Sequence, residues 1–585
     1  MKRLLFAFMA LALSSFGAMA QNKDITITLV ETSDVHGSFF PYDFITRKPK
    51  AGSMARVATF IKDLRQKQGA ENVYLLDNGD ILQGQPISYY YNYIQTQKEN
   101  IAASVLNFMK YDASSVGNHD IETGHAVYDK WIRELNCPVV GANIIDTEKQ
   151  KPYVLPYTII KKKNGVKVAV VGMLTPAIPN WLEENLWKGL HFEDIVLSAK
   201  KTVAALQANE NPDVIVGLFH SGWDGGITTP NYVEDASKKV AEEVDDFDVV
   251  FFGHDHKPRN IIVNNKNGKE VLCLDPANNA QKVAVATITL SPAKKNAKNG
   301  KRFNVIKKSG ELVNIRDLTI DEPFMAHFEN EINEVKSWAN AEIGRFENTI
   351  STKDCFFGNS AFNDLILNLE LQITKADIAF NAPLGFNSSI KAGAITVGDM
   401  FSLYKYENQL YIMKLTGKEI KDYLEMSYNL WVNTMKSADD HLLLLSEDTR
   451  DDSQRLGFKN FSFNFDSAAG IDYEVDVTKP YGQKVNILKM SNGQPFDETK
   501  YYKVAVNSYR GNGGGELLTK GAGIPQDQLK NRIIWRSDLD QRHYLMEEIK
   551  KTGTLNPQSN SNWKFVPTEW TEKAAARDRK ILFGE

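Results

Sequence analysis

The sequence predicts an α/β fold for its first half and a separate α+β domain for its second half. Short runs rich in Val, Ile, Leu and Phe alternate with amphipathic stretches from Asp24 to about Ile320, as expected of strands covered by helices. Several of these runs end in polar residues. Beyond a charged, helix-prone segment the pattern restarts with aromatic-rich runs. A second core is expected, because 585 residues are too many for one.

The first half contains five strand candidates with the character of buried strands. They begin at Ile25 (ITITLVET), Val73 (VYLLDNGD), Val166 (VKVAVVGML), Val214 (VIVGLFH) and Val249 (VVFFGH). Open sheets with parallel strands bind ligands beyond the carboxyl ends of the strands. We therefore expect the functional site where these runs end.

The charged segment from Asp321 to Gly344 is predicted to be one interdomain helix, with Pro323 just inside its start. The expected division is 21–320 for the first domain, 321–345 for the helix and 346–585 for the second domain. Within the second domain, FKNFSFNFD at 458–466 is predicted to be a strand and NSYRGNGGGEL at 507–517 a Gly-rich loop.

Residues 1–20 have the layout of a secretory signal peptide. Lys2 and Arg3 precede an apolar run, and Ala18-Met19-Ala20 precedes Gln21. We expect a secreted protein, in a bacterial periplasm, without a further segment long enough to span a membrane. The formal charge of -4 disfavours a long nucleic acid as partner, and three scattered cysteines exclude a disulfide scaffold or a Cys-rich zinc site. The oligomeric state stays open.

Candidate metal ligands gather in short motifs, most of them at the ends of the predicted strands. The motifs supply Asp34 and His36 (DVH), Asp80 (NGD), Asn118 and His119 (GNHD), His220 (LFH), and His254 and His256 (GHDH). A single Asp-x-His pair is as compatible with a loop hydrogen bond as with a metal. Half of the chain's ten histidines fall in these motifs, however. The joint pattern predicts a metal site.

This ordered set of motifs resembles the calcineurin-like metallophosphoesterase superfamily. The whole chain resembles the secreted 5′-nucleotidase and 2′,3′-cyclic-nucleotide 2′-phosphodiesterase family, which adds a C-terminal nucleotidase domain. The resemblance implies a metallophosphoesterase β-sandwich flanked by helices and two divalent metal ions, such as Mn or Zn. It assigns Asp34, His36 and His256 to one metal, Asn118, His220 and His254 to the other, and Asp80 to both.

In this family the histidine at His119 stays off the metals and acts on the phosphoryl group or the leaving oxygen. Related 5′-nucleotidases orient it with an Asp three positions later, but GNHDIETG has Glu122 there and Asp120 next to the histidine. Either carboxylate could serve, and we predict Glu122. Its replacement by Gln is expected to reduce turnover sharply, beside a mild effect of Asp120→Asn.

The resemblance also marks substrate residues in the second domain. Tyr406 and Tyr509 match the aromatic pair that sandwiches the nucleobase, and Arg510 and Asn381 lie in segments that contact substrate. The Arg and Asp that hold phosphate and ribose in 5′-nucleotidases are missing, since the segments read NAPLGF and GGGEL. This favours a 2′,3′-cyclic-nucleotide 2′-phosphodiesterase/3′-nucleotidase. Alternatives are a 5′-nucleotidase, a UDP-sugar hydrolase or, more remotely, a non-catalytic nucleotide-binding protein.

Overall fold

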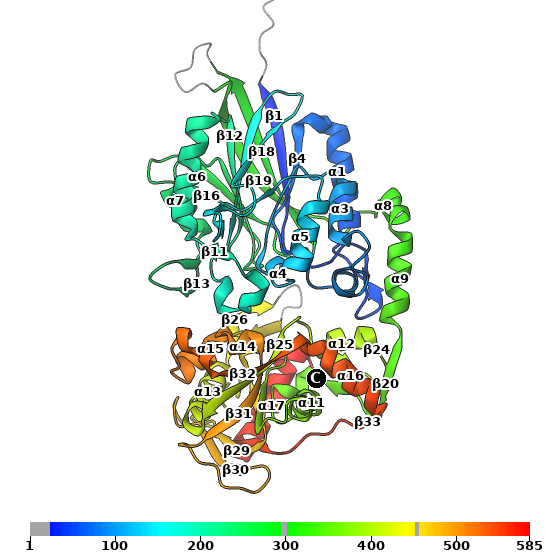
Figure 1. The fold of residues 1–585 in the computed structure, drawn as a ribbon, viewed down its shortest axis with the longest axis vertical. Coiled ribbons are helices and arrows are strands. Elements are labelled where there is room, and N and C mark those ends of the chain that lie inside the picture. The colour runs from blue at the N-terminus through cyan, green and yellow to red at the C-terminus, as the bar shows by residue number, and fades with distance from the viewer. Residues whose placement is uncertain (1–23, 294–300, 451–454) are drawn as a thin grey trace, which may run out of the picture.

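The computed structural model describes residues 24–293, 301–450 and 455–585. The predicted signal peptide lies outside these residues. No helix among these residues is both long and apolar enough to cross a bilayer. The two halves of the chain lie one above the other in Figure 1, joined on one side by α8 and α9.

Two six-stranded sheets form the first half. One has the order β19-β18-β1-β4-β5-β6, and the other β16-β17-β15-β12-β10-β9. The first sheet contains β1 (Ile25–Thr32), β4 (Val73–Asp77), β5 (Ala113–Ser115), β6 (Val139–Val140), β18 (Lys282–Pro292) and β19 (Phe303–Asn314). The second contains β9 (Tyr157–Lys161), β10 (Lys167–Leu174), β12 (Val214–His220), β15 (Val249–Phe252), β16 (Arg259–Asn264) and β17 (Glu270–Asp275).

The sheets pack face to face, because one apolar cluster joins residues of both, such as Leu29 and Leu76 with Val170 and Val216. α1 (Met54–Gln68), α3 (Ile101–Met109) and α5 (His125–Glu134) cover the outer face of the first sheet. α6 (Ile195–Asn209) and α7 (Ser237–Glu243) cover that of the second. The predicted β-sandwich flanked by helices is confirmed.

The five predicted strands correspond to β1, β4, β10, β12 and β15. β1, β4, β5 and β6 are parallel to one another, and so are β10, β12, β15 and β17. Successive side chains along each strand point alternately into the core between the sheets and into the core beneath the covering helices. Burial on both faces explains why the sequence runs are continuously apolar.

The interdomain segment differs from the single helix predicted for it. α8 (Glu322–His327) ends at Phe328, which leaves the helical conformation at φ −103° and ψ 14°, and α9 (Glu329–Ala339) then begins. Pro323 lies in the first turn of α8, as predicted. The predicted helix end at Gly344 is wrong, because this residue lies within β20 (Glu342–Phe346).

The second half is built on a five-stranded sheet of order β28-β22-β31-β25-β32. Its strands are β22 (Ile378–Asn381), β25 (Gln409–Thr416), β28 (Ser467–Ala469), β31 (Tyr501–Asn507) and β32 (Ile533–Asp540). Three-stranded sheets formed by β20, β24 (Gly393–Thr396) and β33 (Thr554–Leu555), and by β29 (Ile471–Asp476), β30 (Val485–Met490) and β34 (Trp563–Val566), complete it. The principal helices are α11 (Ala361–Thr374), α12 (Val397–Leu403), α13 (Gly417–Trp431), α16 (Gln541–Thr552) and α17 (Thr568–Phe583).

The segment 458–466 is not the strand that its alternating aromatics predict. β27 (Arg455–Phe458) ends where it begins, and a short 3₁₀ helix covers Ser462–Asn464. Phe461 is 67% exposed and stacks on Phe463 at 5.1 Å, whereas Phe465 is buried. The alternation therefore reflects a surface pair of rings rather than a pleated strand.

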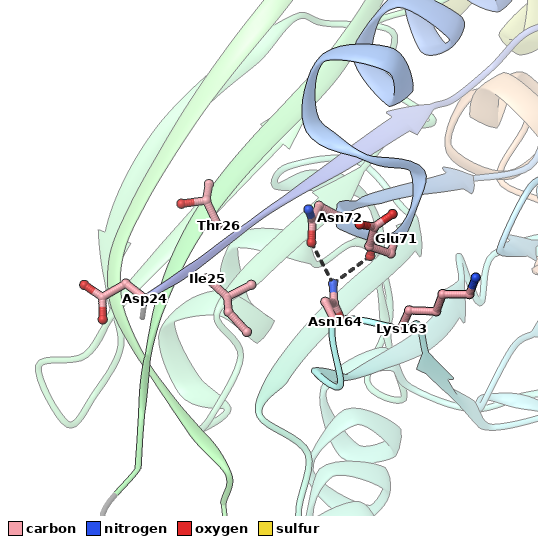
Figure 2. Close-up of a pocket in the computed structure, with 7 residues that line it drawn as sticks. All are labelled: Asp24, Ile25, Thr26, Glu71, Asn72, Lys163 and Asn164. Atoms are coloured by element: carbon pink, nitrogen blue, oxygen red, sulfur yellow. Dashed lines mark hydrogen bonds between the residues drawn. The ribbon is translucent and has the colours of Figure 1, made fainter. Parts of the chain in front are cut away.

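A surface pocket lies at the amino end of β1. Figure 2 shows Asp24 and Thr26 on one side and Glu71, Lys163 and Asn164 on the other, with Asn164 donating to the backbone of Glu71 at 2.6 Å. β1 rises by roughly 3.3 Å per residue, so this pocket lies about a strand length away from the carboxyl end. It is separate from the polar residues that follow the carboxyl ends of the strands.

Candidate dimetal site

The predicted metal ligands follow the carboxyl ends of parallel strands from both sheets. The structure places them after β1 (Asp34, His36), after β4 (Asp80), at the start of α4 (Asn118–Ile121), at the end of β12 (His220) and after β15 (His254, His256). Because the two sheets are packed together, these ends meet at one edge of the sandwich. In Figure 1 this edge, near the labels α4 and β13, faces the C-terminal half.

The glycines of the motifs are required by close backbone contacts. A Cβ at Gly117 would lie 2.1 Å from Asp80 Oδ1, and one at Gly253 would lie 2.4 Å from Asp34 Oδ2. Gly79 has φ +80°, and its Cβ would meet the backbone nitrogen of Gly117 at 2.4 Å. Each glycine thus lets a loop approach a ligand carboxylate or a neighbouring loop.

Left-handed backbone conformations are concentrated in the ligand residues. Positive φ angles occur at Asp34 (51°), His36 (47°), Asp80 (53°), His254 (76°) and His256 (59°). Non-glycine residues in this region cost of order 1–3 kcal/mol each and cluster at functional sites. The strand ends therefore turn sharply, and the side chains point into a common space.

The first group of ligands surrounds one oxygen of Asp34. His256 Nε2 lies 3.1 Å from Asp34 Oδ1, and His36 Nε2 lies 4.0 Å from the same atom. The two imidazole nitrogens are 3.2 Å apart. Asp80 Oδ2 is 3.9 Å from His36 Nε2, so it borders this group as well.

The second group lies on the other side of Asp80. His220 Nε2 is 3.2 Å from Asp80 Oδ2 and 3.1 Å from Asn118 Oδ1. His254 Nδ1 is 2.8 Å from the same Asn118 oxygen. The structure brings all seven predicted ligands together, with Asp80 between the two groups.

The chemistry of these residues fits divalent cations. Asp34 Oδ1 is buried and makes no hydrogen bond of good geometry among the described residues, with His256 Nε2 3.1 Å away as its near neighbour, although an unsatisfied buried oxygen is costly. Without cations, burial lowers the pKa of His36 to about 3, whereas the carboxylates of Asp80 and Asp34 outweigh burial and raise the pKa of His220 to about 10. A bound cation would take the place of the His220 proton, because a ligand imidazole must be neutral. Imidazole, carboxylate and amide oxygen together suit borderline transition metals such as Mn and Zn.

His119 adjoins the ligands but points toward Glu122. Its Nδ1 lies 2.5 Å from Glu122 Oε2. Burial disfavours the charged imidazole, but the carboxylates of Asp80 and Glu122 outweigh it and raise the pKa of His119 to about 10. Cations bound at Asp80 would offset that carboxylate's contribution. Glu122 is then the group that favours a protonated His119.

Asp120 has a different position. Its carboxylate accepts hydrogen bonds from the backbone nitrogens of Asp80, Ile81, Leu82 and Gly117, at 2.8 to 2.9 Å. It therefore holds the Asp80 loop against the start of α4. Of the two candidate partners, the structure pairs Glu122 with His119 and gives Asp120 a supporting contact with the ligand loops.

The sequence analysis did not identify Glu234, which contacts the His254 nitrogen that faces away from Asn118. β13 (Gly225–Thr228) and β14 (Val233–Asp235) form a hairpin that brings Glu234 Oε1 to 3.1 Å from His254 Nε2. This contact leaves His254 Nδ1 facing Asn118 and orients the ring, as carboxylates commonly do behind metal-binding histidines. The hairpin sequence carries no motif that identifies it.

Of the two tyrosines predicted to hold the base, Tyr406 reaches His119 and Tyr509 lies beside another aromatic ring. The Tyr406 ring is parallel to the His119 ring, with centroids 6.2 Å apart and an interplanar angle of 6°. Tyr509, in α14 (Ser508–Gly511), is half-buried and makes an edge contact with Phe463 at 6.2 Å. Burial raises the pKa of Tyr509 to about 12. Phe461 and Phe463 thus extend the aromatic surface beside Tyr509.

Arg510, predicted to contact substrate, is buried within the C-terminal domain, and that contact stays a prediction. Its side chain is 2% exposed, and all five of its N–H donors are used within the domain. They donate to both carboxylate oxygens of Asp466, to Asn464 Oδ1 and to the carbonyl oxygens of Phe463 and Gly514, at 2.7 to 3.1 Å. Arg510 therefore supports the loop that carries Tyr509.

Asn381, at the end of β22, is buried as well. Its amide nitrogen donates to Asn363 Oδ1 at 2.6 Å, and Asn363 donates in return to the Asn381 carbonyl oxygen at 3.0 Å. With 1% of its surface exposed, Asn381 is closed to a ligand in this conformation. Its predicted contact with substrate stays a prediction.

Comparison with known proteins agrees with this geometry. Residues 27–258 match the family model of calcineurin-like phosphoesterases, and residues 342–520 match that of the 5′-nucleotidase C-terminal domain. The chain thus combines a calcineurin-like phosphoesterase domain with a 5′-nucleotidase C-terminal domain. It is a metal-dependent phosphoester hydrolase, as its site geometry indicates.

The relatives cover most of the chain. The 2′,3′-cyclic-nucleotide 2′-phosphodiesterase/3′-nucleotidase of Haemophilus influenzae is 26% identical over 98% of this chain and 92% of its own length. The trifunctional nucleotide phosphoesterase YfkN of Bacillus subtilis is 28% identical over 94% of this chain, which spans only 39% of that longer protein. A 5′-nucleotidase precursor from Thermus thermophilus has the same fold, with a TM-score of 0.63 at 22% identity, covering 93% of this chain and all of its own.

The different positions of Glu122 and Asp120 lead to different expected phenotypes. Glu122→Gln removes the charge beside His119 Nδ1, so kcat is expected to fall by about 10- to 100-fold, with the bound metal unchanged. Asp120→Asn replaces an acceptor of backbone N–H groups by an amide that can accept with only one oxygen. The expected result is a lower unfolding temperature and weaker metal binding. Steady-state kinetics, elemental analysis and thermal unfolding of both variants separate the two effects; equal metal loss in both would contradict the assignment.

Removal of the metal is expected to destabilise the N-terminal domain. Without cations, Asp34 and Asp80 face each other in a buried site with only imidazoles between them. Chelation should therefore lower the unfolding temperature and abolish turnover, and Mn or Zn should restore both. An unfolding temperature that does not change on chelation, in a protein shown to lose metal, would contradict the fit of these residues to cations.

Proposed function

We propose that this protein is a secreted dimetal nucleotide phosphohydrolase that acts on 2′,3′-cyclic nucleotides and 3′-nucleotides. The observation that carries the proposal is the parallel arrangement of Tyr406 and His119. It brings an aromatic side chain of the C-terminal domain to the imidazole proposed to act on the phosphoester. A substrate that joins a stacking base to a phosphoester fits this juxtaposition.

In the proposed mechanism each group has one task. Asp34, His36 and His256 would hold one divalent ion, Asn118, His220 and His254 the other, and Asp80 both. Such a pair of ions lowers the pKa of a bound water and offsets phosphoryl charge. His119, kept protonated by Glu122, donates a proton or hydrogen bond to the leaving oxygen. Tyr406 and Tyr509 hold the base by stacking.

The preference for 3′ and cyclic substrates is supported by the loop after Tyr509. A side chain at Gly515 would meet both Arg510 and Asn464 at 2.2 Å, and its φ is +69°. The loop therefore has no room at this position for the ribose-binding carboxylate that we associate with 5′-nucleotidases, because Arg510 and Asn464 occupy the space. The H. influenzae relative named for the cyclic and 3′ activities matches nearly the whole chain.

The N-terminal sequence supports export to the periplasm. A basic start, an apolar run and the small residues before Gln21 are the elements of a cleavable signal peptide. We propose cleavage at this position, so that the mature enzyme acts on nucleotides outside the cytoplasm.

The substrate preference is tested by initial rates on 2′,3′-cyclic AMP, 3′-AMP and 5′-AMP. The mature enzyme, stripped and reloaded with Mn or Zn, is expected to turn over the cyclic and 3′ substrates faster than 5′-AMP. Dominant hydrolysis of 5′-AMP would overturn the substrate preference while leaving the metal assignment intact.

The role of the tyrosines is tested against a substrate without a base. Tyr406→Ala and Tyr509→Ala each remove a stacking contact worth about 1–3 kcal/mol. KM for 3′-AMP should rise by about 10- to 100-fold, whereas kcat/KM for p-nitrophenyl phosphate should change little. Equal losses on both substrates would show that the tyrosines act on the phosphoester rather than on the base.

A further inference from the structure

Lys50 is a mostly buried cation that takes no part in the proposed mechanism. It follows the hairpin of β2 (Tyr42–Asp43) and β3 (Lys48–Pro49) in the N-terminal domain. Its ammonium group donates to Ser38 Oγ at 2.7 Å and to Asn279 Oδ1 at 3.1 Å. An ammonium group has three N–H donors, so one is left over.

Lys50 forms no ion pair with a carboxylate among the described residues. Both of its hydrogen-bond partners are neutral oxygens. Asp43 is the carboxylate that acts on it most, but Asp43 Oδ1 already accepts from the backbone of Ile45 and Thr46, at 2.9 and 3.1 Å. Burying an ammonium without an anion is costly. Burial accordingly lowers the pKa of Lys50 to about 8.

The partners of Lys50 belong to the loops that carry the metal ligands. Ser38 is two residues beyond His36, and the backbone nitrogen of Asn279 donates to the carbonyl oxygen of Asp34 at 2.9 Å. Ala277, Asn279 and Ala280 have φ angles of 65°, 58° and 48°. Strain of this kind marks functional loops, and it positions Asn279 to hold Lys50 beside the site.

A second lysine, in the C-terminal domain, acts on Lys50 electrostatically. Lys405 is exposed, lies close enough to lower the pKa of Lys50, and has its Nζ 5.3 Å from the centroid of the Tyr406 ring. Tyr406 in turn lies along His119. Lys405 therefore acts electrostatically on Lys50 and also contacts the ring that lies along His119.

We propose that Lys50, supported by Lys405, forms an anion subsite that binds a phosphate group of the substrate. The free N–H donor of Lys50 bonds a phosphoryl oxygen, and the phosphate supplies the ion-pair partner that Lys50 lacks. The anion is either the phosphoryl group that reacts or a second phosphate elsewhere on the nucleotide. The identity of the substrate rests on the proposed function, whereas the subsite itself does not.

The experiment compares Lys50→Met and Lys50→Arg with the wild-type mature enzyme loaded with metal. Lys48→Met, at an exposed lysine of β3, is the matched control. Rates are measured on p-nitrophenyl phosphate, 3′-AMP and adenosine 3′,5′-bisphosphate. Inorganic phosphate and the bisphosphate are also tested as inhibitors of p-nitrophenyl phosphate hydrolysis.

Lys50→Met is expected to weaken phosphate recognition by about tenfold, the effect of one hydrogen bond to a charged group. If Lys50 binds the reacting phosphoryl group, kcat/KM falls on all three substrates and the inhibition constant of inorganic phosphate rises. If it binds a second phosphate, only the bisphosphate is affected: its kcat/KM as a substrate falls and its inhibition constant rises. Lys50→Arg retains most of the affinity, and Lys48→Met leaves every value unchanged.

Changes below twofold in every rate and inhibition constant of Lys50→Met would overturn the proposal. Stability gives a second criterion, because removing a buried charge without an ion-pair partner should keep or raise the unfolding temperature. A lower unfolding temperature in both Lys50 variants, with equal losses of activity, would make Lys50 a structural residue and also overturn it. If no nucleotide is hydrolysed, the proposed function fails, while p-nitrophenyl phosphate and the two inhibitors still test the subsite.

Discussion

The two carboxylates at the centre of the site, Asp34 and Asp80, are the constraint on which the surrounding structure depends. Both are almost fully buried, and the described residues provide them with imidazoles but with no arginine or lysine ion pair. Buried charges of one sign are strongly unfavourable unless cations balance them. The left-handed ligand residues add strain of order 1–3 kcal/mol per residue. Divalent ions compensate for both terms.

Much of this could be predicted from the sequence because it is encoded locally. Continuous apolar runs identified β1, β4, β10, β12 and β15, and strand ends carry the ligands because parallel strands share an edge. The family resemblance pointed to Glu122, three residues after His119. One helical turn brings side chains at this spacing together.

The features that the sequence did not reveal depend on long-range contacts. Glu234 reaches His254 from a separate hairpin, and nothing in its own segment indicates that contact. The aromatics at 458–466 alternate as in a strand, yet Phe461 and Phe463 stack on each other at the surface near Tyr509. Arg510 lies in a loop that suggested substrate, but Asp466, distant in sequence, pairs with it. Only the tertiary fold decides such pairings.

Both domains shape the surroundings of His119. Glu122 of the N-terminal domain holds its Nδ1, Tyr406 of the C-terminal domain lies along its ring, and Asn408 Nδ2 lies 3.5 Å from the second oxygen of Glu122. Arg536 and Glu183 form a further contact between the domains, at 3.5 Å. The environment of His119 is therefore complete only when the two domains are together.

Two buried cations, Arg510 and Lys50, differ in the partners that balance their charge. Burial opposes the charge of Arg510, but Asp466 outweighs it and raises the pKa of the guanidinium, whose five donors are all used. Lys50 has only neutral partners, and its pKa falls to about 8. The first pattern is that of a structural ion pair, which leaves nothing for a ligand to complete. The second leaves an N–H donor and a positive charge available, which is what the proposed phosphate subsite requires.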